Sequence, residues 1–373
     1  MNKKLGFGLM RLPMLDNGKV NFDEFNKMVD EYLERGFTYF DTALMYCDGQ
    51  SEAAVKKGIV ERHPRESFTI TTKMHSGYFK NPEEMEKVFE GQLERTGAGY
   101  FDYYLVHDVN SHSYPHYTKC GTFEWLKDKK DKGLVKCMGF SFHDGPELLD
   151  QVLTEHPEAE FVQLQINYLD WNSVSVRSRE CYEVAVKHGK KVIVMEPVKG
   201  GTLANVPAEV SKLFKDKDPN ASIPSWAIRF AATPENVMLV LSGMSNLEQL
   251  RDNTGYMQDF KPLTDEEFAM ALEAAKIINK EIAIPCTGCS YCTGGCPVGM
   301  PIPTFFSLYN TDKKDINAKN WTPQQELYFN VAKTSCKASD CIKCGMCEGI
   351  CPQSLKIRDL LDEVANYFEV ENA

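Results

Sequence analysis

The sequence is short of positive charge and has no long apolar run. Its formal net charge is -11 at pH 7, and an acidic chain without a basic stripe is a poor partner for nucleic acid or an anionic membrane. All apolar runs fall short of the ~20 residues that a membrane-spanning helix requires. These deficits exclude nucleic acid and membrane from the expected partners.

Two other sequence signals are missing. The first eight residues contain two lysines but no apolar segment of a secretory signal, so we expect a cytoplasmic protein. No G-x-G-x-x-G motif follows a strand-like run, which leaves a Rossmann domain without support. The 373 residues, 43% hydrophobic and 25% charged, have the composition of a soluble globular protein with room for one large and one small domain.

An acid and a phenol, Asp41 and Tyr46, lie five residues apart. Residues 36–40 form a short aromatic and β-branched run, so Asp41 falls where a buried strand emerges into a loop. An Asp in that place can also cap a following helix. The alternative to capping is a role at an active site, for which other residues are needed.

Two further strand-like runs end in ionisable residues, Lys73 and His107. A buried Lys needs a counterion, which Asp41 can provide, whereas a single His in such a place is often structural. Together with Tyr46 these residues suit one reaction. Tyr46 would protonate a carbonyl oxygen while hydride reaches the carbon, and Lys73 would lower the phenol's pKa from its usual ~10. His107 would orient the carbonyl.

Eight strand-like runs alternate with amphipathic helical stretches. This alternation predicts an α/β fold, a parallel (β/α)8 TIM barrel with its chemistry at the carboxyl ends of the strands. Asn21 and Asn81 are predicted to cap two of the helices. The predicted strands are residues 5–12, 38–41, 68–72, 103–106, 135–140, 161–166, 191–195 and 237–241.

At these residues the chain resembles the aldo-keto reductase family. The family's tetrad of Asp, Tyr, Lys and His falls, with the family's spacing, on Asp41, Tyr46, Lys73 and His107. The resemblance covers roughly residues 1–260 and joins four residues from several segments, which makes it specific. It implies an oxidoreductase that uses NADH or NADPH to reduce a carbonyl or to oxidise an alcohol.

The resemblance also implies a cofactor site. Ser141 and Gln163 take the positions that hold the nicotinamide carboxamide, and backbone N–H groups after the last strand are expected to bind phosphate. Met195 stands where many members have a stacking aromatic residue, and Glu196 where a Ser is usual. No basic pair is evident for a 2'-phosphate, Arg251 being the nearest cation, so we expect weak discrimination against NADH. The implied cofactor residues are Ser141, Gln163, Met195, Glu196, Lys199, Ser242, Gly243, Ser245, Gln249 and Asn253.

Eight of the 13 cysteines stand in two repeated runs near the C-terminus. Each run has the spacing C-x2-C-x2-C-x3-C-P, which is typical of bacterial ferredoxins with two [4Fe-4S] clusters. A zinc ribbon would use two C-x2-C pairs without the triple spacing. In the ferredoxin pattern, three thiolates of one run and the last Cys of the other run hold each cluster. The predicted ligand sets are Cys286, Cys289, Cys292 with Cys351, and Cys341, Cys344, Cys347 with Cys296.

The barrel pattern and the cysteine runs together define the predicted domains. Residues 1–262 are the barrel, 263–281 a connecting helix, and 282–373 an α+β ferredoxin-like domain, an arrangement that resembles the iron-sulfur branch of the aldo-keto reductases. Two short amphipathic helices between the runs are expected to dock on the barrel, or else to form a small core of their own. Cys336 is left as a spare thiol.

Two functions are compatible with this sequence. The first is an enzyme that reduces a small carbonyl compound or oxidises an alcohol, and whose clusters exchange electrons with a carrier such as a ferredoxin or flavodoxin, or serve as structure. The second is an electron-transfer protein on a barrel that is catalytically silent or uses a flavin. The intact tetrad favours the first. Because clusters pass single electrons and a nicotinamide takes hydride, direct coupling would require a flavin, for which no site is evident, or a radical-tolerant substrate.

Overall fold

The computed structural model describes residues 3–111, 113–173, 176–313 and 322–369. Eight parallel strands close into a barrel in sequence order, which confirms the predicted TIM barrel. The strands are β1 (Leu5–Gly8), β2 (Tyr39–Asp41), β3 (Thr69–His75), β4 (Phe101–Val109), β5 (Val135–Phe142), β6 (Phe161–Gln165), β7 (Lys191–Met195) and β8 (Val237–Gly243).

Only β7 has the predicted bounds, and the differences in β1, β3 and β4 bear on the site. β1 ends at Gly8 instead of residue 12, because its partner β2 is short and Gly8 pairs with Asp41 at the end of both strands. β3 and β4 run on past the predicted ends, since they pair with each other as far as His75 and His107. His107 therefore lies within a strand, close to its carboxyl end.

Helices surround the barrel, and two of them begin at the predicted cap residues. The Asn21 side chain accepts from the backbone N–H of Glu24, and Asn81 accepts in the same way from Glu84, so both caps are confirmed. The barrel helices are α1 (Phe22–Glu34), α2 (Ser51–Val55), α3 (Pro82–Thr96), α4 (Tyr114–Lys119), α5 (Thr122–Asp131), α6 (Pro146–Glu155), α7 (Ser178–Lys187), α8 (Ala208–Lys217), α9 (Ile223–Ala232), α10 (Leu247–Met257) and α11 (Asp265–Glu281).

Helix α11 belongs to the core of the barrel. Its buried residues Ala271, Ala274 and Ile278 join the large hydrophobic cluster between the strands and the outer helices, and it packs against α8 and α9. Thr264 starts the helix with a capping box, in which Thr264 and Glu267 satisfy each other's backbone N–H groups. The chain leaves the barrel only after α11.

The C-terminal domain has a hydrophobic core of its own. Phe305 and Phe306 of α13 pack with Tyr328 of α14 and with Leu361 and Phe368 of α16. The predicted docking of the α13 and α14 apolar faces on the barrel is therefore wrong, and the alternative of a small separate core is correct. Among its described residues this domain has helices and cysteine-bearing loops and no strand. Its helices are α12 (Tyr291–Gly294), α13 (Ile302–Lys313), α14 (Pro323–Thr334), α15 (Met346–Gly349) and α16 (Ile357–Phe368).

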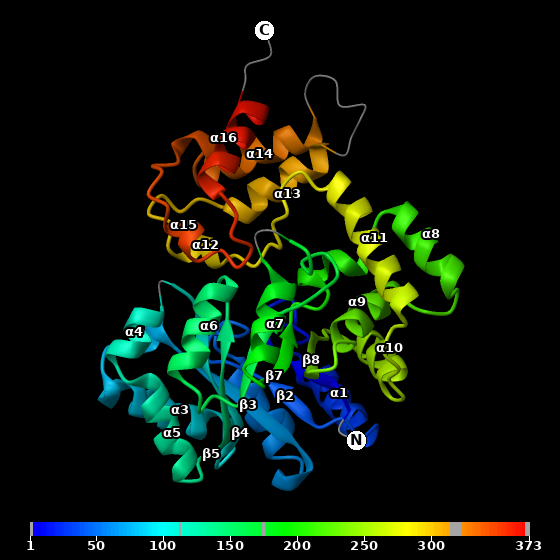
Figure 1. Ribbon diagram of the computed structural model, residues 1–373. Coiled ribbons are helices and arrows are strands. Elements are labelled where there is room, and N and C mark those ends of the chain that lie inside the picture. Colours follow the sequence, from blue (N-terminus) through cyan, green and yellow to red (C-terminus); the bar gives the residue numbers. More distant parts are fainter. Residues whose placement is uncertain (1–2, 112, 174–175, 314–321, 370–373) are drawn as a thin grey trace.

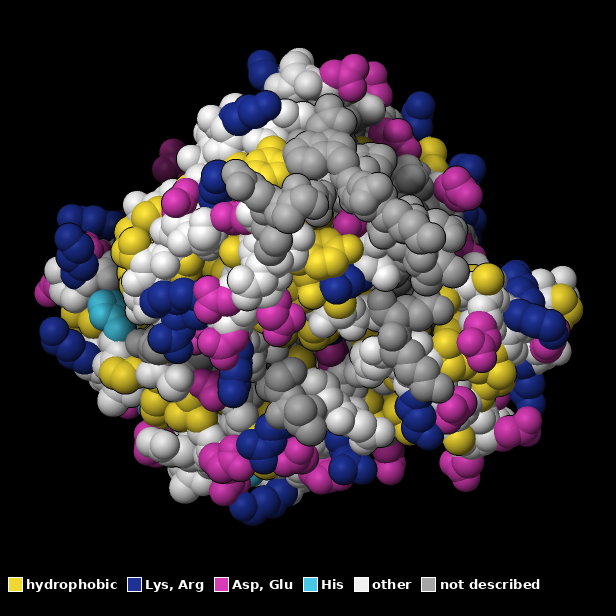
Figure 2. Space-filling model, turned by 90° about the horizontal axis from the view of Figure 1, so that it is seen from above, with side chains coloured by type: hydrophobic (Ala, Val, Ile, Leu, Met, Phe, Trp, Pro, Cys, Tyr) yellow, Lys and Arg dark blue, Asp and Glu magenta, His cyan; other side chains and the backbone are white. Residues whose placement is uncertain are grey.

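The C-terminal domain lies over one end of the barrel (Figure 1). Seen from above, the described part of this face carries interspersed acidic and basic side chains (Figure 2). None of the described helices is both long and apolar enough to span a membrane. The end of the barrel that the domain covers is the end where the predicted tetrad lies.

Candidate active site and cluster sites

The predicted tetrad converges at the covered end of the barrel. Asp41 ends β2, and Tyr46 lies in the turn that follows. Lys73 and His107 lie near the carboxyl ends of β3 and β4. Tyr46, Lys73 and His107 line one cavity, which we call the reaction cavity, with about 610 Å3 of empty space, part of it open to solvent. Asp41 and Tyr46 line an adjoining open groove.

Lys73 and Asp41 form a buried ion pair below the phenol. Lys73 Nζ donates to Asp41 Oδ1 over 2.5 Å and to the backbone oxygen of Thr42 over 2.8 Å. Nζ also lies 4.7 Å from the centroid of the Tyr46 ring. Burial lowers the pKa of Lys73, and the negative charge of Asp41 opposes that shift. The pair thus places a cation beneath Tyr46.

Tyr46 is a protonated phenol beside a neutral imidazole. The pKa of Tyr46 is raised well above its ordinary value by burial and then by the charges of Asp41 and Glu196. The predicted lowering of this pKa by Lys73 is not found, because burial and the two carboxylates all raise it. Burial is also the largest cause that lowers the pKa of His107, which is therefore uncharged at pH 7. The ring centroids of Tyr46 and His107 are 6.2 Å apart.

Ser141 and Gln163 lie side by side on β5 and β6 and line the reaction cavity. The Ser141 hydroxyl accepts from the backbone N–H of Asp108 over 2.8 Å, which fixes its position. Gln163 Oε1 is buried and has no hydrogen-bond partner among the described residues. A buried acceptor of this kind fits a ligand amide N–H, such as that of a nicotinamide carboxamide.

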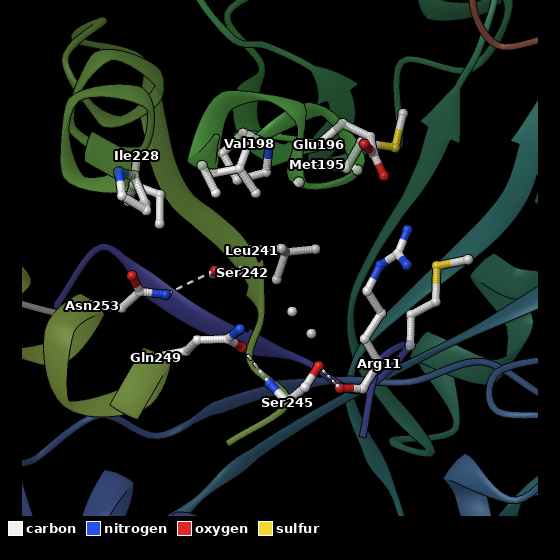
Figure 3. Close-up of a pocket in the computed structure, with 18 of the residues that line it drawn as sticks. Arg11, Met195, Glu196, Val198, Ile228, Leu241, Ser242, Ser245, Gln249 and Asn253 are labelled. Atoms are coloured by element: carbon white, nitrogen blue, oxygen red, sulfur yellow. Dashed lines mark hydrogen bonds between the residues drawn. The ribbon is translucent and has the colours of Figure 1, made fainter. Parts of the chain in front are cut away.

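The groove continues from the reaction cavity past the end of β8 (Figure 3). Asn253 Nδ2 donates to Ser242 Oγ over 3.0 Å, and the backbone N–H of Ser245 donates to Gln249 Oε1 over 2.7 Å. Helix α10 begins at this point, with Asn246 as its cap. The groove holds about 1210 Å3 of empty space, part of it open to solvent, and Gly243 lines it as well. A helix start beside an elongated groove suits the phosphates of a dinucleotide.

The cations of this region are placed differently from the expectation. Arg251 points away from the groove and pairs with Glu31 of α1 over 2.9 Å. Arg11, which follows β1, instead lines both the groove and the reaction cavity, and Ser245 Oγ donates to its backbone oxygen over 2.9 Å (Figure 3). Sequence reasoning missed Arg11 because it extended the first strand to residue 12 and searched for cations only after strand eight.

The C-terminal domain supplies one wall of the reaction cavity. Thr287, Cys289, Tyr291, Pro352 and Gln353 line it together with the barrel residues. Tyr291 thus shares the cavity with Tyr46, and burial is the main cause that raises the pKa of Tyr291. Sequence reasoning did not find these residues, since no local signal says that a C-terminal segment covers a barrel.

Lys199 ties the barrel to this wall. Its Nζ, which is buried, donates to Asp170 Oδ1 and to Gln353 Oε1, the latter over 2.6 Å. The other oxygen of Asp170 accepts from Gln165 and Asn167, both over 2.8 Å. The structure thus turns Lys199, predicted to bind the cofactor, toward the C-terminal domain and away from the groove.

The chain next to Lys199 also touches the C-terminal domain. Gly200 has φ +62°, and a Cβ built there would lie 2.8 Å from the backbone oxygen of Thr287. Neighbouring Val198 and Gly201 line the groove. One short loop after β7 is therefore shared by the groove and the domain contact.

Four of the predicted cluster ligands lie together. Cys286, Cys289, Cys292 and Cys351 line a single cavity with apolar neighbours such as Ile302 and Phe306. The residue before Cys296 lies against the second run, since a Cβ built at Gly295 would be 3.9 Å from side-chain atoms of both Met346 and Ile350.

These thiols fit iron-sulfur clusters better than single metal ions. A cluster with four irons and one thiolate for each iron holds its sulfur ligands farther apart than one ion does. In the described part of the chain, no group of three or more His, Cys, Asp or Glu residues is close enough to hold one ion. Backbone N–H groups donate to Cys286 Sγ from Gly288 over 3.5 Å and to Cys296 Sγ from Met300 over 3.4 Å.

The barrel and its site agree with one known family. The model of the aldo/keto reductase family matches residues 4–276, which is most of the chain. The chain therefore belongs to the aldo/keto reductase family. It is an oxidoreductase of this type that carries a second domain, since the 4Fe-4S dicluster domain matches residues 285–356. Both parts of the resemblance noted in the sequence are confirmed.

Individual relatives are distant. An aldo-keto reductase of Mycolicibacterium vanbaalenii is 26% identical over 260 residues, covering 68% of this chain and 84% of that protein. An L-galactose dehydrogenase of Arabidopsis thaliana is 23% identical over 288 residues, with 72% and 89% covered.

Solved structures resemble the fold of the barrel. Aldo-keto reductase AKR11C1 of Bacillus halodurans, in its holo form, superposes with a TM-score of 0.60 at 22% identity and covers 73% of this chain and 91% of its own. An aldo-keto reductase of Klebsiella pneumoniae in complex with NADPH superposes with a TM-score of 0.59 at 16% identity, with 74% and 90% covered. At these identities the likeness establishes the fold alone.

Proposed function

We propose that this protein reduces a carbonyl group, or oxidises the corresponding alcohol, with Tyr46 as the general acid. The observation that carries the proposal is the convergence of Tyr46, His107 and the buried Lys73–Asp41 pair at one cavity. In the reducing direction the Tyr46 hydroxyl gives its proton to the carbonyl oxygen, and the nearby Lys73 ammonium stabilises the phenolate that remains. Neutral His107 donates a hydrogen bond to the same oxygen and orients it.

A nicotinamide dinucleotide bound in the groove would supply the hydride. Ser141, Gln163 and Met195 would hold its nicotinamide end, since Gln163 offers a free buried acceptor. Residues at the start of α10 would hold its phosphates, with Arg11 as the nearest cation. The residues that we assign to this phosphate end are Ser242, Gly243, Ser245, Gln249 and Asn253.

We further propose that the two cysteine sets hold two [4Fe-4S] clusters that exchange single electrons with an outside carrier, such as a ferredoxin or flavodoxin. Support comes from Cys289, which lines both the cavity formed by the first cysteine set and the reaction cavity. This shared lining is also compatible with the second candidate function, an electron-transfer protein on a barrel that is catalytically silent or uses a flavin. The convergent tetrad favours the enzyme.

The test is the variant Tyr46→Phe, with Tyr291→Phe as a matched control that removes the other phenol of the cavity. We expect Tyr46→Phe to lower kcat by about 10²- to 10⁴-fold, as loss of a general acid does, and to change cofactor affinity little. Turnover is measured anaerobically after iron content has been verified in each variant. Wild-type turnover in Tyr46→Phe, or a larger loss in Tyr291→Phe, would move the acid away from Tyr46.

A further inference from the structure

Glu196 has an unusual backbone conformation, which hydrogen bonds hold in place. It follows β7 with a φ of +55°, a region that residues other than glycine seldom occupy and that concentrates at functional sites. Its backbone oxygen accepts from Asn167 Nδ2 over 3.0 Å and from the backbone N–H of Lys199 over 3.1 Å. Asn167 is fully buried and also bound to Asp170. These contacts fix the backbone from which the carboxylate projects.

The carboxylate faces the reacting end of the barrel. Glu196 lines both the groove and the reaction cavity, and Figure 3 shows the Glu196 and Arg11 side chains extending toward one another. Tyr46, His143 and Tyr291 line the reaction cavity together with Glu196. The carboxylate is thus close to all three side chains.

One oxygen of this carboxylate has nothing to bind. Glu196 Oε2 is buried and has no hydrogen-bond partner among the residues that the structure describes. Leaving such an acceptor unsatisfied costs its full desolvation penalty, and more when it is charged, so the site is built for a donor that arrives with a ligand. Arg11 and Lys73 line the same cavity and would repel a cationic donor. A neutral hydroxyl can donate to the carboxylate without that repulsion.

We propose that Glu196 binds a hydroxyl group close to the reacting carbonyl, so that the substrate class is the hydroxy ketones and hydroxy aldehydes. This inference rests on the proposed carbonyl reduction and makes Glu196 a residue of substrate specificity instead of cofactor binding. A site that hydrogen-bonds a substrate hydroxyl rejects the analogue without it, because the buried acceptor is then left unpaired.

The experiment compares ketones that differ only in hydroxyl against methyl. Hydroxyacetone and butanone test the adjacent carbon, and 4-hydroxy-2-butanone and 2-pentanone test the next one. With the anaerobic, iron-loaded protein and either reduced nicotinamide, we expect kcat/KM to favour the hydroxylated member of at least one pair by about 100-fold or more. Glu196→Met, similar in volume but without the acceptor, should reduce that preference to within about threefold, and Glu196→Gln should lie between.

A binding measurement separates the two proposals. Affinity for the same ketones is measured by ligand-observed NMR without turnover, where wild type should favour the hydroxylated members and Glu196→Met should not. Reduction of none of the ketones would count against the proposed function, while a hydroxyl preference in binding would still support the role of Glu196. Equal kcat/KM and equal binding within each pair would overturn the inference. Preference for aminoacetone over hydroxyacetone would overturn it too, since the carboxylate would then select positive charge.

Discussion

The barrel and the C-terminal domain are stabilised in different ways. The barrel closes its sheet and buries large side chains such as Trp226 and Tyr104 in a core that continues into α11. The C-terminal domain has a much smaller core, in which Cys292 and Cys347, two of the predicted cluster ligands, are themselves buried members. A small domain buries a smaller fraction of its surface than a large one and is correspondingly marginal, and bound metal can supply folding free energy. We therefore expect the barrel to fold by itself and the domain to need its clusters.

The strongest way to break this contrast is to remove cluster ligands. We expect wild type to hold about eight iron and eight sulfide per chain, and Cys296→Ala with Cys336→Ala to hold about four or fewer. The double change is needed because Cys336 lies beside Cys296 and Cys341 and can replace the lost ligand. Iron and sulfide are assayed after anaerobic purification.

Cys336→Ala alone is the control and should keep all of its iron. Barrel integrity is followed through the circular dichroism of the barrel and through dinucleotide binding, both of which we expect to survive in the double variant. Full iron in the double variant would contradict the crossed ligand sets. About four iron in wild type, with no loss of solubility on chelation, would mean that one run is empty.

A smaller effect is expected from Lys199, whose ammonium pairs with Asp170 inside the barrel and donates to Gln353 of the C-terminal domain. Lys199→Met removes the cation that pairs with the buried Asp170, and breaking a buried ion pair typically costs about 3–5 kcal/mol. We expect hydrogen exchange to increase first around Gln353 and the α12 segment, while the strands on the far side of the barrel stay protected.

Two further variants sharpen this test. Lys199→Met with Asp170→Asn removes both charges and should recover most of the lost stability. Lys212→Met, an exposed lysine paired only with Asp216 on its own helix, should change stability by less than about 0.5 kcal/mol. A Lys199→Met protein as protected as wild type would show that the hydrogen bond from Lys199 to Gln353 does not hold the domains together.

The smallest effect concerns the barrel alone. We expect NADPH to be favoured over NADH by less than about 100-fold, or about 2.7 kcal/mol, because Arg251 is engaged by Glu31 and Lys199 by Asp170. Arg11→Met should weaken both cofactors alike, since Arg11 also lines the reaction cavity and lies toward the nicotinamide end. Both affinities are titrated at one salt concentration, with iron-loaded and chelator-treated protein. A loss confined to NADPH in Arg11→Met would assign Arg11 to the 2'-phosphate.

Much of the site followed from the sequence because a parallel barrel gathers its strand ends. Asp41, Lys73 and His107 are far apart in the chain, but each follows an apolar strand run, and the alternation of strands and helices brings such ends to one face. The pairing of Lys73 with Asp41 followed from the need of a buried ammonium for a counterion. Local pattern and elementary electrostatics were sufficient for these residues.

Other parts depend on how distant segments pack, which no local pattern specifies. The apolar faces of α13 and α14 predicted that these helices are buried on one side. Tertiary packing determines that they are buried against α16 instead of the barrel. Tyr291 and Gln353 reach the reaction cavity only because the domain covers it. The raised pKa of Tyr46 depends on burial and on Glu196, and neither was known from the spacing of Tyr46 and Lys73.

The close contact at Gly200 has an evolutionary consequence. A side chain there would collide with the backbone of Thr287, and the backbone conformation itself favours glycine. The second domain thus adds a steric constraint to the one that the backbone already imposes. Related barrels that have lost the domain keep the backbone constraint but lose the collision, so they should vary more often at this position than barrels that retain it.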